Sequence, residues 1–492
     1  LMATRYVRLS GADSNNGTTP ALAWRTVTKA LGATGIASGD IVYIGGGTYR
    51  ETVSVAMTSP TVETRVVGDV DGSQTGDAGP VQITAYTTND TTAPATVVTF
   101  DFNSKNYLTV ENILFVGGNP TSNASGVNIS GNNNKLINCA ILAVGKQSGG
   151  YSIYISCAAN VASTILIDRC RLLNLRSQAI YVVLPRNASA HYDAAVTIRN
   201  CCIVTIGNDC VQINPSGTGS FYGGGVDVES CTLFGQVGLR TITAELSTTI
   251  PCTINNSLVI SGASTGILAT TSGQITENYN RIWSATPRSN VTAGANSVTD
   301  NAQAMLLEFG QSLIWGDLTP RDFLEPMTGS PVLGFGNTAS SPTPPTTDLT
   351  GRPRPSGGAS TSYAVGAFER HDTGVIDTGS NSDGGSGGHL RLTGPADHDL
   401  AVPVDAVSTT LTIKVAWDTN HGNTTKPQII LLAAPELGVT EQTVTATGTA
   451  GSAYETLTTS AFTPTAAGVV ILRLRSRSGA GNGIARFDTV TM

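Results

Sequence analysis

The stretch "IRNCCI" at residues 198–203 is one copy of a six-residue pattern that recurs along the chain. Most copies read apolar, polar, Asn-like, small, variable and apolar. They begin 26 to 31 residues apart, as "VENILF" (110–115), "LINCAI" (136–141), "IDRCRL" (167–172), "IRNCCI" (198–203), "VESCTL" (228–233) and "INNSLV" (254–259). Self-similarity at such a period predicts a solenoid of stacked coils.

A second series of short apolar runs follows the first in phase. It reads "GVNISG" from 126, "YSIYIS" from 151, "AIYVVL" from 179, "CVQINP" from 210 and "GLRTIT" from 238. The period of two within each run predicts strands rather than helical turns. Stacking about nine or ten such coils places like residues over like. We therefore expect an inward apolar ladder of Ile137, Ile167, Ile198, Val228 and Ile254, with Asn138, Asn200 and Asn256 stacked at one corner.

The eight cysteines show no C-x2-C pair of the kind that binds zinc. Four of them fall in one column of the repeat, at Cys139, Cys170, Cys201 and Cys231. A free cysteine behaves as a small buried hydrophobe, so the column is predicted to fill a tight interior ladder. The alternative is a redox or metal role.

The composition excludes some partners. A net charge of −7 and a pI near 5.3 argue against nucleic acid, which needs a basic face. No apolar run approaches the ~20 residues of a membrane span, so no membrane insertion is expected. The first residues, "LMATRYVRLSG", show no basic segment followed by an apolar core, and we expect no signal peptide there.

Two N-terminal stretches carry a resemblance to a known family. "YVRLSGADSNNGTTPALAWRTVTKAL" (6–31) and "SGDIVYIGGGTYRETVSV" (38–55) resemble the opening of the right-handed parallel β-helix superfamily, which includes pectate-lyase-like and chondroitinase-like enzymes. "GSPVLGFG" (329–336) and "DLTGRPRPSGG" (348–358) are similar to its terminal pattern. The resemblance implies a right-handed parallel β-helix over 1–371, with a short N-terminal capping helix and a C-terminal exit segment. This fold hosts lyases, hydrolases, adhesins and virion spikes, so it implies no single function.

The C-terminal region has a different pattern. Residues 372–388 read as a Gly/Ser linker, and 389–492 alternate like an antiparallel β-sandwich of jelly-roll type. The ending resembles carbohydrate-binding modules, which implies glycan contacts from Trp417, His421 or Arg473. The alternative is a sandwich that caps the solenoid or joins subunits.

Carboxylates supply the candidate catalytic residues. "IGNDCVQI" (206–213) resembles the Gly-Asp-Asp-Cys segment of polygalacturonases, but Asn208 replaces one Asp, and the Gly-His-Gly and Arg-x-Lys of that family are absent. We therefore expect Asp209 to mark a corner before a strand. Scattered acidic pairs also serve glycosidases, which leaves Asp193, Asp209, Asp227 and Glu229 as candidates. A lyase would instead use basic residues, for which Lys146, Arg171, Arg176, Arg186 and Arg199 are available.

"GDVDGSQTGDAG" (68–79) resembles a calcium loop, with Asp69, Asp71 and Asp77 as oxygen ligands for Ca²⁺. It lacks the Glu at the twelfth position of an EF-hand. An Asx-turn between strands is the alternative interpretation.

Two classes of function follow from these features. The first is a virion or extracellular β-helix protein, of the phage tail-fibre, tail-spike, minor tail or capsid-decoration type. It would bind a polysaccharide or cell-surface glycan, as a homotrimer or together with other virion proteins. The alternative is a polysaccharide lyase or glycoside hydrolase with an appended carbohydrate-binding module.

Overall fold

The chain forms two compact units, Leu1–Arg370 and His371–Met492, each of which is described by itself. The structure is a computed structural model. It describes residues 2–86, 98–117, 125–143, 150–157, 164–174, 177–187, 195–205, 208–216, 221–222, 225–235, 237–241, 252–299, 307–309, 323–326, 335–337, 345–349, 354, 365–367, 374–377, 389–393, 395–404, 407–417, 426–434, 437–449, 455–465, 468–477 and 484–491.

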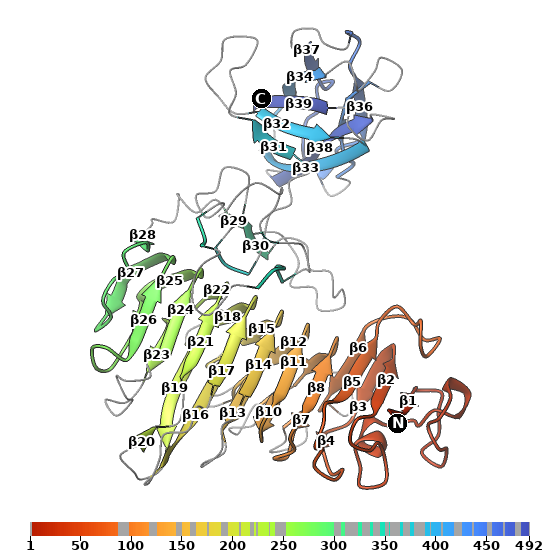
Figure 1. Ribbon diagram of the computed structural model, residues 1–492. Helices are drawn as coiled ribbons and strands as arrows, with labels where there is room; N and C mark the ends of the chain where they lie inside the picture. The colour runs from red at the N-terminus through yellow and green to blue at the C-terminus, as the bar shows by residue number, and fades with distance from the viewer. Residues whose placement is uncertain are drawn as a thin grey trace. The chain divides into compact units, whose positions relative to one another are not determined.

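The first unit is a parallel β-helix, which confirms the predicted solenoid (Figure 1). One strand from each of ten successive coils forms a ten-stranded parallel sheet, called here the first face. Its strands are β1 (Thr4–Val7), β2 (Ile41–Gly45), β5 (Thr64–Asp69), β8 (Leu108–Glu111), β11 (Asn134–Ile137), β14 (Thr164–Asp168), β17 (Ala195–Arg199), β21 (Val226–Glu229), β24 (Cys252–Asn255) and β26 (Ile275–Asn278).

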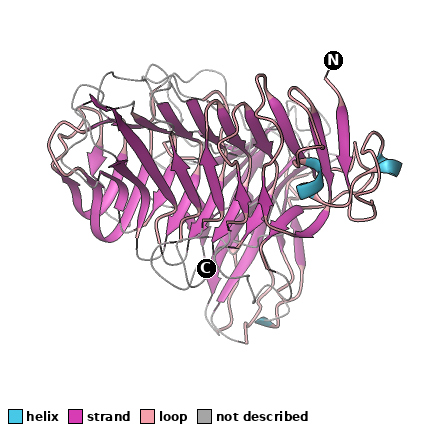
Figure 2. Ribbon diagram, turned by 90° about the horizontal axis from the view of Figure 1, so that it is seen from below, coloured by secondary structure: helices cyan, strands magenta, loops and turns pink. Residues whose placement is uncertain are grey.

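Two further parallel faces run beside the first, and Figure 2 shows their strands stacked along the solenoid. The second face contains β3 (Gly47–Arg50), β6 (Val81–Thr84), β9 (Leu114–Val116), β12 (Ala140–Ala143), β15 (Arg171–Asn174), β18 (Cys202–Thr205), β22 (Thr232–Phe234), β25 (Leu258–Leu268), β27 (Arg281–Ser289) and β28 (Val298–Thr299). The third face contains β4 (Val53–Ser54), β7 (Phe100–Asp101), β10 (Val127–Ser130), β13 (Ile153–Ser156), β16 (Ile180–Asn187), β19 (Asp209–Ser216) and β23 (Val237–Thr241). The long β25 reaches both faces, and β20 (Phe221–Tyr222) pairs with the end of β16.

One residue in the left-handed conformation turns the chain from the first face to the second. The φ angles at this corner lie between 50° and 59° at Asn112, Asn138, Arg169, Asn200, Ser230, Asn256 and Tyr279. Asn tolerates this region better than most L-residues, which explains the Asn-like position of the repeat. An amide hydrogen bond along this corner joins Asn138 Nδ2 to Asn112 Oδ1, at 2.8 Å. The predicted stack of Asn138, Asn200 and Asn256 is interrupted, because Arg169 and Ser230 occupy the corners between them. The Asn200 amide instead donates to the Thr347 carbonyl, also at 2.8 Å.

The interior ladder differs from the prediction at one coil. Leu136, not Ile137, pairs in register with Val110 and Ile167, and its side chain is fully buried. Ile137 lies opposite Asp168 on the outer side. The sequence "LINCAI" does not show which of these two residues points inward, because both are apolar. In the neighbouring coils the outer position is charged, as Glu111 and Asp168, so the direction is clear there.

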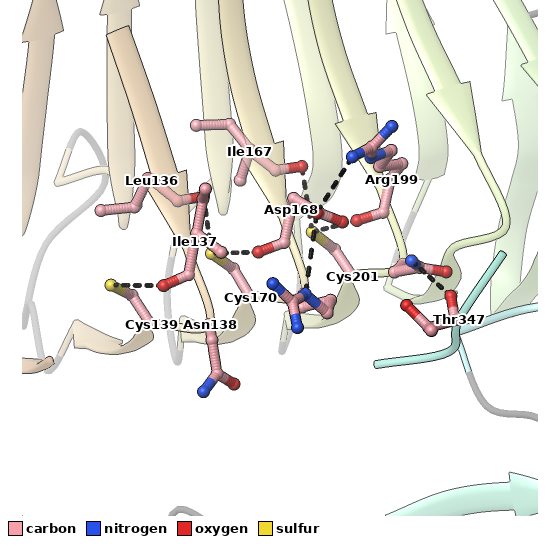
Figure 3. A network of polar contacts seen from close by, with 12 residues as sticks. Leu136, Ile137, Asn138, Cys139, Ile167, Asp168, Cys170, Arg199, Cys201 and Thr347 are labelled. Carbon is pink, nitrogen blue, oxygen red and sulfur yellow. Dashed lines mark hydrogen bonds and ion pairs between the residues drawn. The ribbon is translucent and has the colours of Figure 1, made fainter. Parts of the chain in front are cut away.

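The cysteine column is confirmed as part of the packed interior. Cys139, Cys170, Cys201 and Cys231 are fully buried and free. Each thiol donates toward a carbonyl one coil back, as in Cys170 to Leu136 at 3.5 Å and Cys201 to Ile167 at 3.6 Å (Figure 3). A small side chain with a weak donor fits this position, which borders both the apolar core and the backbone of the preceding coil.

We expect none of the eight cysteines to react with a thiol reagent in the native protein, and all eight to react in concentrated guanidinium chloride. Burial raises the pKa of Cys170 and Cys201 well above the usual value and that of Cys202 to about 12. The reactive thiolate is therefore suppressed as well as shielded. Titration with Ellman's reagent before and after denaturation measures both states, and rapid native labelling would contradict the buried column.

The two ends of the apolar core are covered in different ways, by a short helix at one end and by an ion pair at the other. At the N-terminal end, η1 (Pro20–Leu22) precedes the short helix α1 (Val27–Ala30), whose Val27 and Ala30 are buried, as predicted for a capping helix. The Glu51 carboxylate accepts the first free N–H groups of α1, from Val27 and Thr28, both at 2.8 Å. At the other end, Glu277 and Arg288 form an ion pair of 2.7 Å at positions that are apolar in earlier coils.

Four short described stretches between residues 335 and 367 lie over the outer side of the second face. The described parts, called here the exit segment, are 335–337, 345–349, 354 and 365–367. They cover an outward apolar row made of Leu142, Leu173, Val204, Phe234, Ile260 and Trp283. Gly366 has a φ of +98°, and a Cβ there would lie 2.7 Å from the Thr232 hydroxyl, so the close approach requires glycine. The remaining strands of this unit, β29 (Leu307–Phe309) and β30 (Phe323–Pro326), pair with each other.

The second unit consists of two antiparallel sheets around one apolar core, which confirms the antiparallel sheets predicted for this region. β31 lies inside the stretch 372–388 that the sequence predicts as a linker, where only two apolar residues between Gly and Asp signal a strand. The strands of this unit are β31 (Gly374–Asp377), β32 (His389–Thr393), β33 (Pro395–Val404), β34 (Thr412–Trp417), β35 (Gln428–Leu431), β36 (Gln442–Thr445), β37 (Glu455–Thr458), β38 (Gly468–Arg477) and β39 (Ile484–Thr491).

No helix among the described residues of the chain is long and apolar enough to span a bilayer.

Candidate functional site

Three tyrosines cluster on the outer side of the third face. Tyr154 of β13 and Tyr181 of β16 are in register, and their inward neighbours Ile153 and Ile155 are fully buried. The Tyr154 and Tyr181 rings are stacked with centroids 5.9 Å apart, and Tyr151 stacks on Tyr181 at 4.4 Å. Burial and the neighbouring tyrosines raise the pKa of Tyr151 and Tyr154, so both hydroxyls stay protonated at neutral pH.

Polar side chains continue the same row on either side of the tyrosines. Register places Asn128 before Tyr154, and Gln212 and then Arg240 after Tyr181. The row from Asn128 to Arg240, called here the tyrosine row, spans five strands and thus about 19 Å at the ~4.8 Å strand spacing. Asn214 supports it by donating to the Tyr181 hydroxyl at 2.6 Å. Gln212 is only 7% exposed, whereas the tyrosines, Asn128 and Arg240 are half-buried. The row therefore offers ring surface beside hydroxyls, one amide and a guanidinium group.

Asp209 lies at one edge of the tyrosine row, at the start of β19, as predicted for a corner residue. Its carboxylate is 1% exposed, and Arg240 Nη1 approaches it at 3.4 Å. Burial raises the pKa of Asp209, and Arg240 partly offsets the rise. Within the described residues its charged neighbour is this arginine and not a second carboxylate, so the described geometry does not form a glycosidase pair here.

The other carboxylate candidates lie elsewhere. Asp227 and Glu229 are on β21 of the first face, on a different sheet from β19, and Asp193 lies outside the described residues. Asp227 accepts the Thr253 hydroxyl at 2.7 Å. The structure therefore does not bring Asp209, Asp227 and Glu229 into one site.

Glu229 is buried next to the exit segment. Its Oε1 accepts from Asn256 Nδ2 at 2.8 Å and from the Ser230 hydroxyl at 3.1 Å, while Oε2 has no hydrogen-bond partner among the described residues. Asn256 in turn joins the exit segment, since its Oδ1 accepts the Asn337 N–H at 2.8 Å. Burial raises the pKa of Glu229 to about 8, against the opposing effects of its hydrogen bonds and of Arg354. These contacts make Glu229 part of the attachment of the exit segment.

The basic candidates for lyase chemistry are likewise apart. Arg171 is largely buried on the outer side of the second face, and burial lowers its pKa. Arg199 is on the first face, paired with Asp168 at 3.2 Å. Lys146, Arg176 and the side chain of Arg186 lie outside the described residues.

The predicted calcium loop is held by protein donors. Asp69 Oδ2 accepts from Gln74 N and from both the N–H and hydroxyl of Thr75, at 2.6–3.0 Å. Asp71 accepts from Ser73 N, and Asp77 pairs with Arg8, which lowers the pKa of the Asp77 carboxyl. No group of three His, Cys, Asp or Glu in the described part of the chain is arranged to hold a metal ion. The loop geometry therefore agrees with the Asx-turn interpretation.

The glycan contacts predicted in the second unit do not form a described site. Trp417 is 3% exposed and packs in the core, so its ring surface is not available to a sugar. Arg473 is half-buried on β38 opposite Asp399 of β33, and His421 lies outside the described residues. The tyrosine row was missed at the sequence level, although the repeat places Tyr154 of "YSIYIS" and Tyr181 of "AIYVVL" at the same outward position.

Comparisons with known proteins show distant structural likenesses only. No family model and no curated protein sequence matches the chain. A complex of XylC with xylose has a TM-score of 0.33 and 11% identity, covering 58% of this chain and 70% of that one. A tailspike mutant of the E. coli bacteriophage HK620 in complex with a pentasaccharide has a TM-score of 0.32 and 12% identity, covering 96% and 85%. The enzymatically active domain of tailspike protein 4 of bacteriophage CBA120 has a TM-score of 0.18 and 11% identity, covering 94% and 64%. Likenesses at these TM-scores do not assign a function to this chain.

Proposed function

We propose that this protein is a virion or extracellular β-helix protein of the tail-spike or tail-fibre type that binds a glycan along the tyrosine row. The observation that carries the proposal is the cluster of three tyrosine rings in a row with Asn128, Gln212 and Arg240. A sugar presents apolar C–H groups beside hydroxyls, and aromatic rings flanked by a few polar groups are suited to it. The rigid stacking of the coils holds these side chains in place before a ligand binds, which lowers the entropic cost of association.

Binding is favoured over cleavage by the environment of Asp209. Hydrolysis needs two carboxyl groups on opposite sides of a sugar, whereas Asp209 is buried against Arg240. Assays of reducing ends and unsaturated products on a glycan panel separate the two functions. Turnover that is abolished by Asp209→Ala or Asp227→Ala would establish the lyase or hydrolase alternative. A native mass of three chains would support the spike type.

Tyr181→Ala is expected to weaken glycan binding about 10-fold or more, equivalent to ~1.4 kcal/mol, because it removes the ring on which Tyr151 and Tyr154 stack. Isothermal titration with the oligosaccharide that scores best on the panel measures the change. Tyr43→Ala is the matched control, since Tyr43 stacks on Tyr6 on the first face with centroids 6.4 Å apart. Equal losses in both variants would remove the tyrosine row from the proposal.

A further inference from the structure

A groove of about 450 Å³ lies on the outer side of the first face, away from the tyrosine row. Its lining includes Leu166 and Thr197, at neighbouring positions on β14 and β17, and it is bordered by Tyr107, Lys135 and Arg199. The volume falls within the ~300–1,000 Å³ of small-molecule sites. Apolar and polar groups therefore meet in a concave surface that no part of the proposed function uses.

The charges that line this groove are compensated. Lys135 Nζ lies 2.7 Å from Glu63 Oε1, and the Thr109 hydroxyl also donates to Glu63, at 2.8 Å. The hydrogen bond from Lys135 lowers the pKa of Glu63. Arg199 Nη2 lies 3.2 Å from Asp168 Oδ2. An anionic ligand would compete with these carboxylates for both cations, so the groove is better suited to a neutral, hydroxyl-bearing ligand.

Tyr107 occupies a backbone position that does not suit tyrosine. Its φ is 56°, in the left-handed region, and Asn133 holds the equivalent position of the next coil with the same φ. Asn adopts this conformation readily, whereas a bulky residue adopts it at a cost in strain, as Arg169 and Tyr279 also do at the corner between the first and second faces. Two backbone hydrogen bonds hold the residue in place, from Tyr107 N to Asn132 O and from Thr64 N to Tyr107 O. Asparagine would serve the fold here, yet the chain places a 37% exposed aromatic ring beside the groove.

We infer that the first-face groove is a second sugar-binding site, which binds a short stretch of a neutral glycan. The ring of Tyr107 and the side chain of Leu166 would contact the apolar surface of the sugar. This site is separate from the tyrosine row. The inference rests on the proposed function only for the class of ligand.

The test uses the whole chain carrying Tyr181→Ala, so that binding at the tyrosine row is already weakened. Oligosaccharides from dextran, xylan and mannan serve as neutral probes, and oligogalacturonate serves as the acidic one. We expect residual saturable binding of a neutral probe, and adding Tyr107→Asn should weaken it at least 10-fold. Because Asn relieves the left-handed strain, the melting temperature of that variant should be unchanged or higher, which a merely structural tyrosine would not produce.

Several outcomes would overturn the second site. If the wild type binds a probe and Tyr181→Ala abolishes all binding, the result supports glycan binding at the tyrosine row and refutes the second site in the groove. Residual binding that Tyr107→Asn leaves unchanged, or a melting temperature that falls together with binding, would make Tyr107 structural. Preference for oligogalacturonate would refute the neutral ligand. A wild-type chain that binds no probe would overturn both the proposed function and this inference.

Discussion

Leu136→Ala is expected to lower the free energy of unfolding of the β-helix by about 2–5 kcal/mol, the cost of a cavity in a close-packed core. Ile137→Ala, one residue away, should lower it by under ~1.5 kcal/mol. The Leu136 side chain is fully buried between Val110 and Ile167, whereas Ile137 is on the outer side beside Asp168. Both positions lie at the end of β11, just before the corner at Asn138, so the comparison isolates the direction of the two side chains.

The midpoint of urea unfolding, compared at equal slope, measures both effects. A single-residue slip in register would exchange them, because strand side chains alternate between the two sides of a sheet. A larger loss at Ile137 than at Leu136 would therefore contradict the register described above.

Glu229→Gln is expected to remove a pH dependence of stability. Burial raises the pKa of Glu229 to about 8 in the folded protein, above the usual ~4.5 of the unfolded chain. The folded state thus binds the proton more tightly, and the resulting stabilisation is complete below pH ~4.5. It declines as the pH rises through about 8, by up to ~5 kcal/mol. Near neutral pH the neutral carboxyl is favoured in its buried place beside Asn256.

The measurement compares unfolding midpoints of the wild type and Glu229→Gln between pH 5 and pH 9, so that other titrating groups cancel. The variant should match the wild type at low pH and exceed its stability at high pH, since Gln resembles the neutral carboxyl. Asp227→Asn, on the same strand, is the matched control. A difference between wild type and Glu229→Gln that stays constant with pH would show that Glu229 is ionised in the folded state.

Much of the β-helix could be predicted because its repeat is local. The corner residues, the cysteine column and the capping helix can each be recognised from a few neighbouring residues. This is possible because every coil packs against its two neighbours in the same way. Ile137 was assigned to the wrong side because periodicity cannot choose between two adjacent apolar residues. The partner strands make that choice, by placing Leu136 against Val110 and Ile167.

The candidate sites depend on register across coils, which a single chain segment does not reveal. Tyr154 and Tyr181 are 27 residues apart in sequence but in register in the fold. Glu229 is a catalytic candidate by residue type, but in the fold its partner Asn256 bonds to Asn337 of the exit segment, which lies more than 100 residues from Glu229 in sequence.

The sequence by itself determined the strand pattern, the parallel solenoid and the separate antiparallel unit, because these follow from periodicities of two and of about 30 residues. Only the tertiary structure decided which outward side chains the exit segment covers. Apolar residues such as Val204 and Ile260 on the outer side lie under the exit segment, whereas Tyr154 and Tyr181 form an outward row. The physical reason is that burial depends on which distant segment covers a surface, and no local pattern records that contact.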